Sequence, residues 1–362
     1  LVQGKPTSAT GAGQANGLFG WGIAHEIGHN MDKLGKAECT NNIYSLALQA
    51  WDGSSMALNT RLTEDGRWED IFNKVAQGRP GAANNVFVQL GMYWQLHLAY
   101  DGADEPLAFF NAFFKAWKAG DYTYDERVAL IASKVANKDL TEFFTRWGMT
   151  LGEGAKALLD DYAPETRAIW YLNDASRTYC LESGSAAGGT ATVSASVDES
   201  KVTLTISHTD SANVLGYEIR RNGKAIAFTT KTTYVDDLGA ANNLTYTYSV
   251  VPVDKLGNLG AEAKAEEVRV AYDKTIDDSL YNLTRAENGT ITIVMKSGTS
   301  VPVTGIKVTG TSLTGTYTVK VKADAAAETW TDAKSGELSD NLVAYFNKPG
   351  VDSSDTRIWT YD

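Results

Sequence analysis

The sequence predicts a multidomain protein in which a mainly α portion is followed by two all-β sandwich domains. Apolar residues recur at intervals of three and four up to about residue 172, which is the period of helices packed on one face. After the small-residue segment 183–190, strand-forming residues alternate with polar ones. The length of 362 residues also favours several domains, because one hydrophobic core rarely serves more than about 250–300 residues.

Eight helices are expected in the first domain, which we place at residues 1–182. Each corresponds to a long segment with helical periodicity and no strand pattern. The predicted helices are 18–31, 39–51, 64–76, 85–100, 106–119, 125–136, 140–147 and 154–161.

Two β-rich domains are expected beyond this portion. Residues 190–272 contain short alternating strands such as 202–206 and 246–251, separated by an Asn222-Gly223 turn signal, and about seven such strands imply a sandwich. Residues 275–362 read as a jelly-roll-like accessory domain, a candidate carbohydrate-binding module. Trp330 and Trp359 are expected in its core, with stacking on sugar rings as the alternative.

Composition narrows the classes of partner. The net charge of -11, from 33 basic and 44 acidic residues, disfavours binding to nucleic acid or to an anionic membrane surface. No apolar run approaches the roughly 18 residues that span a bilayer. The two cysteines, Cys39 and Cys180, are too few for a disulfide scaffold and form one bridge or none.

The motif that predicts chemistry is His25-Glu26-Ile27-Gly28-His29. In a helix, residues four apart lie on one face, so His25 and His29 present two imidazoles to one metal ion. Zinc accepts neutral imidazole, and a catalytic zinc keeps three protein ligands and one water. Glu26 is then placed to activate the zinc-bound water and to pass its proton to the leaving amine. With four histidines in the chain, a match by chance is a poor explanation.

A third ligand is required, and the spacing offers several. The metzincin pattern needs a histidine at position 35, which is glycine here. The thermolysin-like class uses a glutamate from the following helix, and Glu38, separated from His29 by eight residues, lies at the start of the next predicted helix. Glu38 is therefore preferred. The alternatives at longer spacing are Glu64, Glu69 and, less favoured, His97.

Oxyanion and substrate contacts are harder to predict. Tyr93, Trp94 and His97 lie close together on the predicted helix 85–100 and offer a hydroxyl, an indole for sugar stacking and an imidazole. They are the candidates for such contacts. For each of them, packing inside the fold is the favoured interpretation.

The segments WGIAHEIGHN (21–30), ECTNNIYSL (38–46) and MYWQL (92–96) resemble the enhancin-like zinc metallopeptidase family. This gluzincin family includes viral enhancins and bacterial mucin-degrading O-glycopeptidases, and the resemblance covers about residues 1–172. In the family, the third ligand is a glutamate eight or more residues after the second histidine and followed by Thr-Asn-Asn, a pattern that Glu38 fits. The resemblance implies the helical lobe of a thermolysin-like zincin, a zinc cofactor and O-glycosylated, mucin-type substrates.

Two further implications concern domain organisation. Family catalytic domains have a β-containing lobe before the zinc helix, whereas 24 residues precede His25, so an N-terminal lobe is expected to be missing. The segments GYEIRRNG (216–223), TYTYSV (245–250) and DKLGN (254–258) resemble a fibronectin type III module of the sort found in bacterial extracellular enzymes.

The expected function is zinc-dependent endopeptidase cleavage of mucin-type glycoproteins, with the protein secreted or held on a bacterial surface. Two alternatives stay open. One is a thermolysin-like protease that is indifferent to glycans. The other is a mucin-binding adhesin whose metal site is structural.

Overall fold

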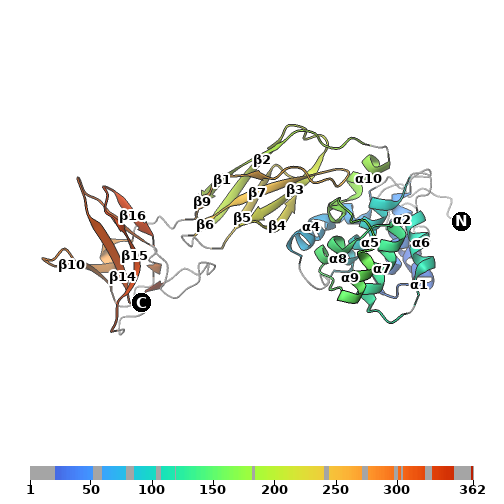
Figure 1. Cartoon of the computed structure of the whole chain (residues 1–362), viewed down its shortest axis with the longest axis horizontal. Helices are drawn as coiled ribbons and strands as arrows, with labels where there is room; N and C mark the ends of the chain where they lie inside the picture. Colours follow the sequence, from blue (N-terminus) through green and yellow to red (C-terminus); the bar gives the residue numbers. More distant parts are fainter. Residues whose placement is uncertain are drawn as a thin grey trace. The chain divides into compact units, whose positions relative to one another are not determined.

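The structure is a computed structural model of the whole chain (Figure 1). The chain divides into two compact units, the first made of Leu1–Val193, Ile206–Thr232 and Tyr248–Ala265, and the second of Ser194–Thr205, Thr233–Thr247 and Glu266–Asp362. The residues that the structure describes are 21–51, 59–78, 85–102, 107–118, 120–181, 184–239, 244–270, 276–296, 301–302, 305–322, 328–345 and 360–361.

Helices occupy the first part of the chain. They are α1 (Trp21–Met31), η1 (Thr40–Asn42), α2 (Ile43–Ala50), α3 (Arg61–Glu64), α4 (Arg67–Gln77), α5 (Val86–Tyr100), α6 (Ala108–Ala116), α7 (Tyr124–Ala136), α8 (Thr141–Arg146), α9 (Glu153–Leu159), η2 (Ile169–Tyr171), α10 (Asp174–Leu181) and, later in the chain, η3 (Asp278–Leu280).

Each of the eight predicted helical segments overlaps a helix, with two differences in detail. The segment 64–76 is divided between α3 and α4, because Gly66 adopts a left-handed conformation with φ 66° between them. Helix α10 was not expected. Residues 18–20, 106 and 119 of the predicted helices lie outside the described residues.

Strands follow from residue 191. They are β1 (Ala191–Asp198), β2 (Lys201–His208), β3 (Val214–Arg221), β4 (Lys224–Thr229), β5 (Thr233–Asp237), β6 (Thr245–Tyr246), β7 (Tyr248–Asp254), β8 (Ala263–Lys264), β9 (Val268–Arg269), β10 (Tyr281–Arg285), β11 (Ile291–Met295), β12 (Val301–Pro302), β13 (Gly305–Val308), β14 (Thr316–Val321), β15 (Thr331–Glu337), β16 (Leu342–Tyr345) and β17 (Thr360–Tyr361). The sheets have the orders β1-β2-β5, β4-β3-β7-β8, β6-β9, β10-β11, β12-β17, β13-β16 and β14-β15.

Helix α5 lies in the core of the first unit. It is apolar on nearly every side, so ten of its 15 residues, Val88 and Leu90–Leu98 without a gap, are buried. Trp94 and Tyr93 are among the largest fully buried side chains of the chain. The position of α5 matters for the site, because α1 and α2 pack on the same core through Trp21, Ile43 and Leu46.

The predicted fold class is wrong, because the structure is mixed, with about 35% helix and 29% strand. The sheet β4-β3-β7-β8 packs into the helical core, where the ring of Phe228 stacks on Tyr171 at 4.0 Å and meets Phe72 at 4.8 Å. Buried Glu218 on β3 accepts hydrogen bonds from the Tyr171 hydroxyl and from Arg146. A mainly α portion therefore does not stand alone.

Beyond residue 276, the described strands form two-stranded antiparallel pairs. Trp330 is 50% exposed, with the Lys322 ammonium 5.2 Å from the centre of its ring, so the expected core role for it is wrong. Trp359 lies outside the described residues.

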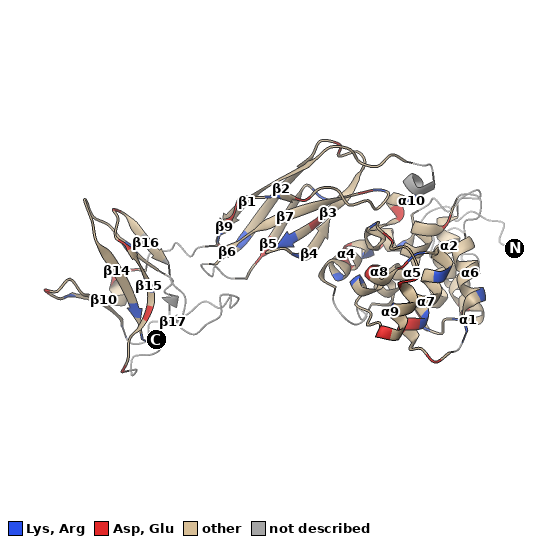
Figure 2. Ribbon diagram, in the orientation of Figure 1, with Lys and Arg blue, Asp and Glu red and all other residues tan. Residues whose placement is uncertain are grey.

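Three other sequence features have a place in the structure. Cys39 is a free, buried thiol, and burial raises its pKa to about 12, so it is unreactive; the side chain of Cys180 lies outside the description. Among the described helices, none is long and apolar enough to cross a membrane. Basic and acidic residues are interspersed along the described elements (Figure 2).

Candidate metal centre

The two histidines of the motif lie on one side of α1. The helix is anchored through the buried residues Trp21, Ala24 and Gly28, and the Ser45 hydroxyl on α2 donates to the carbonyl of Trp21 at 3.2 Å. His25 and His29 are four residues apart, and their Nε2 atoms lie 3.1 Å from each other. The helix thus directs two imidazole nitrogens to one point, as the spacing predicts.

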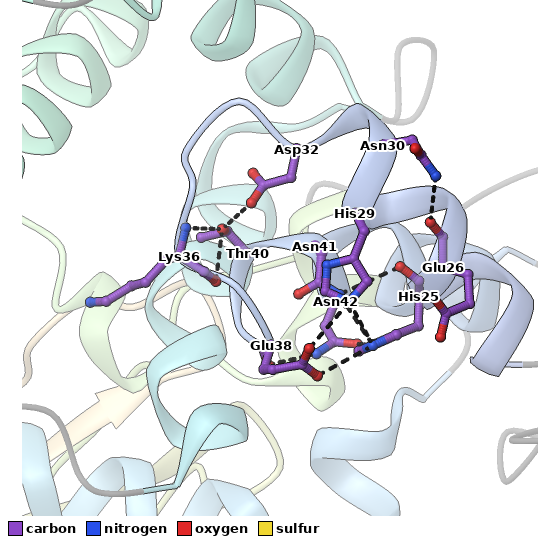
Figure 3. A network of polar contacts seen from close by, with 10 residues as sticks. All are labelled: His25, Glu26, His29, Asn30, Asp32, Lys36, Glu38, Thr40, Asn41 and Asn42. Atoms are coloured by element: carbon purple, nitrogen blue, oxygen red, sulfur yellow. Dashed lines mark hydrogen bonds and ion pairs between the residues drawn. The ribbon is translucent and has the colours of Figure 1, made fainter.

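Glu38 comes from the loop between α1 and η1. Its two carboxylate oxygens lie 3.3 Å from Nε2 of His25 and 3.2 Å from Nε2 of His29 (Figure 3). Glu38 has φ 64°, a left-handed backbone conformation that is uncommon for a residue other than glycine. That conformation turns the side chain of Glu38 toward α1.

The donor atoms of these three residues fit a zinc ion. Zinc bonds of about 2.0–2.1 Å in a tetrahedron place ligand atoms about 3.3 Å apart, and the three observed separations are 3.1, 3.2 and 3.3 Å. Two imidazoles and a carboxylate are the ligands of thermolysin-type zinc sites. In the described part of the chain, the ligand atoms of His25, His29 and Glu38 lie close enough to one another to hold one metal ion.

The site is open to solvent on one side. The exposed fractions of the side chains are 18% for His25, 33% for His29 and 62% for Glu38. Glu26 is exposed, and its side chain lies beside that of His25 (Figure 3). The partial exposure of the three side chains leaves the ligand atoms accessible to water.

A tight contact holds the ligand loop against α1. A Cβ atom at Gly28 would lie 2.2 Å from the carbonyl oxygen of Asn41, closer than real Cβ atoms come to backbone. Only glycine therefore lets the segment after Glu38 pack on the helix between the two histidines. This explains the residue at the fourth position of the motif.

Side-chain hydrogen bonds shape the ligand loop itself. The Asp32 carboxylate accepts from the backbone N–H groups of Leu34 and Gly35 and, at 2.6 Å, from the hydroxyl of Thr40. The Thr40 hydroxyl also accepts from the N–H of Lys36 at 3.2 Å (Figure 3). The loop is thus pinned at both ends around Glu38.

Comparison with known families bears on this site. Residues 2–148, which include both histidines and Glu38, match the family described as Peptidase M60, enhancin and enhancin-like. Residues 2–148 are thus similar to an M60 metallopeptidase domain, which supports a metallopeptidase. This is the family that the zinc motif and the Thr-Asn-Asn segment predicted.

Solved structures with the same fold are M60 peptidases from Clostridium perfringens. The ZmpC catalytic domain, in complex with the sialyl T antigen, has 29% identity and a TM-score of 0.57, covering 68% of this chain and 50% of that one. The catalytic module of ZmpA has 27% identity and a TM-score of 0.54, covering 71% and 50%. A ZmpB structure with two CBM32 domains has 29% identity and a TM-score of 0.56, covering 68% and 26%. This chain thus spans half or less of the length of each of these structures. A search of curated proteins found no match.

The alternative third ligands of the M60 domain lie elsewhere. Glu64, at the end of α3, and Glu69, on α4, are exposed and do not join the cluster with His25 and His29. Glu38 joins it because the left-handed turn and the loop bonds direct its carboxylate there. Sequence spacing could not distinguish these glutamates.

The three candidates for substrate contact lie inside the M60 domain. Tyr93, Trp94 and His97 are 1%, 1% and 0% exposed, so the predicted contacts with substrate are not supported. The Tyr93 hydroxyl lies 3.1 Å from the Tyr124 hydroxyl, and burial raises the pKa of Tyr93 well above the usual range. Packing, the interpretation favoured from the sequence, is what the structure gives them.

His97 and Trp94 take part in a buried polar network. His97 Nδ1 lies 2.5 Å from the Asp101 carboxylate, and the Trp94 indole donates to Asp174 at 2.8 Å. Burial lowers the pKa of His97, an effect that the hydrogen bond to Asp101 partly opposes. His97 is therefore a neutral core histidine at pH 7.

Asn41 and Asn42 are site residues that sequence reasoning named without assigning a role. Asn42 Oδ1 lies 2.8 Å from His25 Nδ1, and Asn41 Nδ2 lies 3.3 Å from His29 Nε2. Both are buried. The signal for them was the Thr-Asn-Asn segment after Glu38.

Proposed function

We propose that this chain is the metal-binding part of a zinc-dependent endopeptidase that cleaves O-glycosylated, mucin-type glycoproteins. The observation that supports it best is the set of three ligand atoms spaced for one tetrahedral ion, with Glu26 beside them. The similarity to ZmpC, solved with the sialyl T antigen, favours a glycan-bearing substrate.

His25, His29 and Glu38 would hold the zinc ion, and Glu26 would act as the general base. Zinc, when bound, lowers the pKa of water towards about 7 and polarises a carbonyl group. Glu26 accepts the proton of the attacking water and later delivers it to the leaving amine, which lets one carboxylate serve both halves of hydrolysis. Its exposure on α1 leaves room for the water and the peptide.

The remaining parts of the proposal concern the other domains and the location. We propose the limits 1–182, 190–272 and 275–362, with a fibronectin type III-like module in the middle. The half-exposed Trp330 supports glycan binding by the last segment, because an exposed indole face stacks on sugar rings. A secreted or surface-attached protein would meet such substrates.

The first test compares the zinc-loaded chain with its Glu26→Gln variant on a mucin-type glycoprotein and on the same protein stripped of glycans. We expect cleavage of the glycosylated form only, mapped by mass spectrometry, and a loss of about 10²–10⁴ in rate for the variant, because the base is removed while its shape is kept. Zinc content should be unchanged, since Glu26 is not a proposed ligand.

Glu69→Gln is the matched control, because Glu69 is an exposed helical glutamate outside the cluster. It should keep both zinc and activity. Cleavage of the stripped substrate at the same rate would indicate a glycan-independent protease. Binding of mucin without any product, unaffected by Glu26→Gln, would indicate an adhesin with a structural metal site.

A further inference from the structure

Asn42 occupies a helix-capping position without capping its helix. It is the N-cap of α2, yet its side chain makes no capping hydrogen bond, and its backbone is helical with φ −75° and ψ −8°. Asparagine is favoured at N-caps because its side-chain oxygen accepts from the first turn. Asn85 does this for α5, where its Oδ1 accepts from the N–H of Phe87 at 2.9 Å. Asn42 is therefore not explained by local helix structure.

The side-chain amide of Asn42 instead contacts two of the proposed metal ligands, His25 and Glu38. Its Nδ2 donates to the backbone carbonyl of Glu38 at 2.8 Å, and its Oδ1 lies 2.8 Å from Nδ1 of His25. A carbonyl oxygen can only accept, so the first contact fixes which end of the amide is nitrogen. The oxygen must then face His25. With 2% of its surface exposed, the amide has both ends committed within the protein.

This orientation determines the tautomer of His25. Because Asn42 Oδ1 can only accept, His25 carries its hydrogen on Nδ1 and donates it. The lone pair is then on Nε2, the atom that faces Glu38 and His29. A metal ion requires this unprotonated nitrogen, and a partner on the other ring nitrogen is the usual device that secures it.

The second contact acts on the backbone of Glu38. A left-handed conformation at a glutamate persists only where its surroundings hold it. The loop supplies hydrogen bonds from the N–H groups of Cys39 and Thr40 to the carbonyl of Lys36, and Asn42 holds the carbonyl of Glu38 itself. The same amide thus acts on the helix ligand and on the loop ligand.

We infer that Asn42 is the positioning residue that couples the two halves of the metal centre, fixing the His25 tautomer and the Glu38 backbone together. The inference rests on the proposed function, because it presumes a metal ion at these ligands. Asn41 does not share this role: its Nδ2 lies 3.2 Å from His25 Nδ1, 3.5 Å from His25 Nε2 and 3.3 Å from His29 Nε2, and a donor cannot accept the hydrogen on His25 Nδ1. Of the two contacts at His25 Nδ1, the one from Asn42 Oδ1 is the shorter, at 2.8 Å against 3.2 Å.

The test measures Zn²⁺ affinity of the full chain by competition with a chromogenic chelator. Asn42→Ala should weaken binding about 10–100-fold, the usual effect of losing a partner behind a metal ligand. The matched control is Asn85→Ala, which removes a true cap. It should lower the thermal midpoint of the metal-free chain and leave Zn²⁺ affinity as in the wild type. Equal affinity of Asn42→Ala and wild type would overturn the inference.

The conservative variant Asn42→Asp keeps an acceptor for His25 and loses the donor to Glu38. It should bind Zn²⁺ more tightly than Asn42→Ala and less tightly than wild type. If both variants bind equally weakly, the contact to His25 is not used. Wild-type protein that binds no Zn²⁺ would instead refute the proposed function, so the two failures differ.

A measurement on the wild type does not depend on any variant folding. With four histidines in the chain, ¹⁵N-labelled histidine gives a resolvable spectrum by two-bond ¹H–¹⁵N correlation. Metal-free protein at pH 8 should show His25 with its hydrogen on Nδ1. A hydrogen on Nε2 would overturn the inference.

Discussion

Helices α1 and α5 each place a histidine four residues before a second metal-ligating side chain, and the two pairs have opposite environments. On α1, His25 and His29 are 18% and 33% exposed, and their Nε2 atoms face each other and Glu38. His97 on α5 and Asp101, the C-cap residue of α5, have fully buried side chains. The spacing is the same, so the spacing alone does not make a metal site.

The partners of each pair explain the difference. Asp101 is engaged by protein groups: it accepts from His97 and from the N–H of Phe109. On α1, the ligand atoms of His25, His29 and Glu38 face one another, and Asn42 contacts His25 at the other ring nitrogen, Nδ1. The first arrangement closes a core, and the second leaves a place for a cation. Solvent access and a third ligand within reach therefore separate the two uses of one helical spacing.

The largest expected effects come from breaking each pair in turn. His29→Ala should abolish Zn²⁺ binding in a competition assay and leave the stability of the metal-free chain close to wild type, because His29 is partly exposed.

Asp101→Ala should lower the free energy of unfolding by about 3 kcal/mol, since it leaves His97 and the Phe109 N–H without an acceptor. Urea unfolding followed by tryptophan fluorescence measures it.

The comparison requires that His29→Ala lose Zn²⁺ binding and that Asp101→Ala lose stability. Asp101→Ala that folds should bind Zn²⁺ as the wild type does. A variant at Asp101 that loses Zn²⁺ while keeping its stability would place the buried pair in the metal centre and contradict the comparison.

A smaller effect is expected in the pH dependence of stability. Burial lowers the pKa of His97 in the folded chain below its ordinary value of 6.5. Below pH 6.5, the unfolded chain therefore takes up a proton that the folded chain does not, and stability falls as the pH is lowered. His97→Gln removes this proton uptake, so its stability should fall less steeply below pH 6.5.

The measurement is urea unfolding of both proteins in the presence of a chelator at pH values between 5 and 8. The chelator keeps the α1 site metal-free in both, so the difference between them isolates His97. Identical slopes for the two proteins would show that His97 does not resist protonation in the fold.

The smallest effect is expected at Tyr93. Tyr93→Phe removes one buried hydroxyl that contacts Tyr124 and should cost about 1 kcal/mol of stability. Turnover and Zn²⁺ affinity should be unchanged, because the ring lies in the core. A fall of ten-fold or more in turnover, measured beside Glu26→Gln, would return this hydroxyl to the reacting site.

The sequence by itself determined the helices and half of the candidate centre. Apolar periodicity predicted α1, α2 and α4 to α9, since helix packing depends on residues close in the chain. The spacing of His25 and His29 predicted two nitrogens directed to one point, because helix geometry converts a spacing of four into one face. The same motif predicted the M60 family.

Only the tertiary structure decided the rest. A left-handed backbone conformation and the hydrogen bonds of its loop distinguish Glu38 from Glu64 and Glu69 as the third ligand. The spacing of these glutamates in the sequence does not encode either feature. Tyr93, Trp94 and His97 are buried because α5 is apolar on nearly every side, so no periodicity shows which side faces solvent. The sheet β4-β3-β7-β8 joins the helical core through Phe228, against Phe72 and Tyr171. Such contacts between residues far apart in the chain leave no local pattern, which is why the prediction of a mainly α first portion failed.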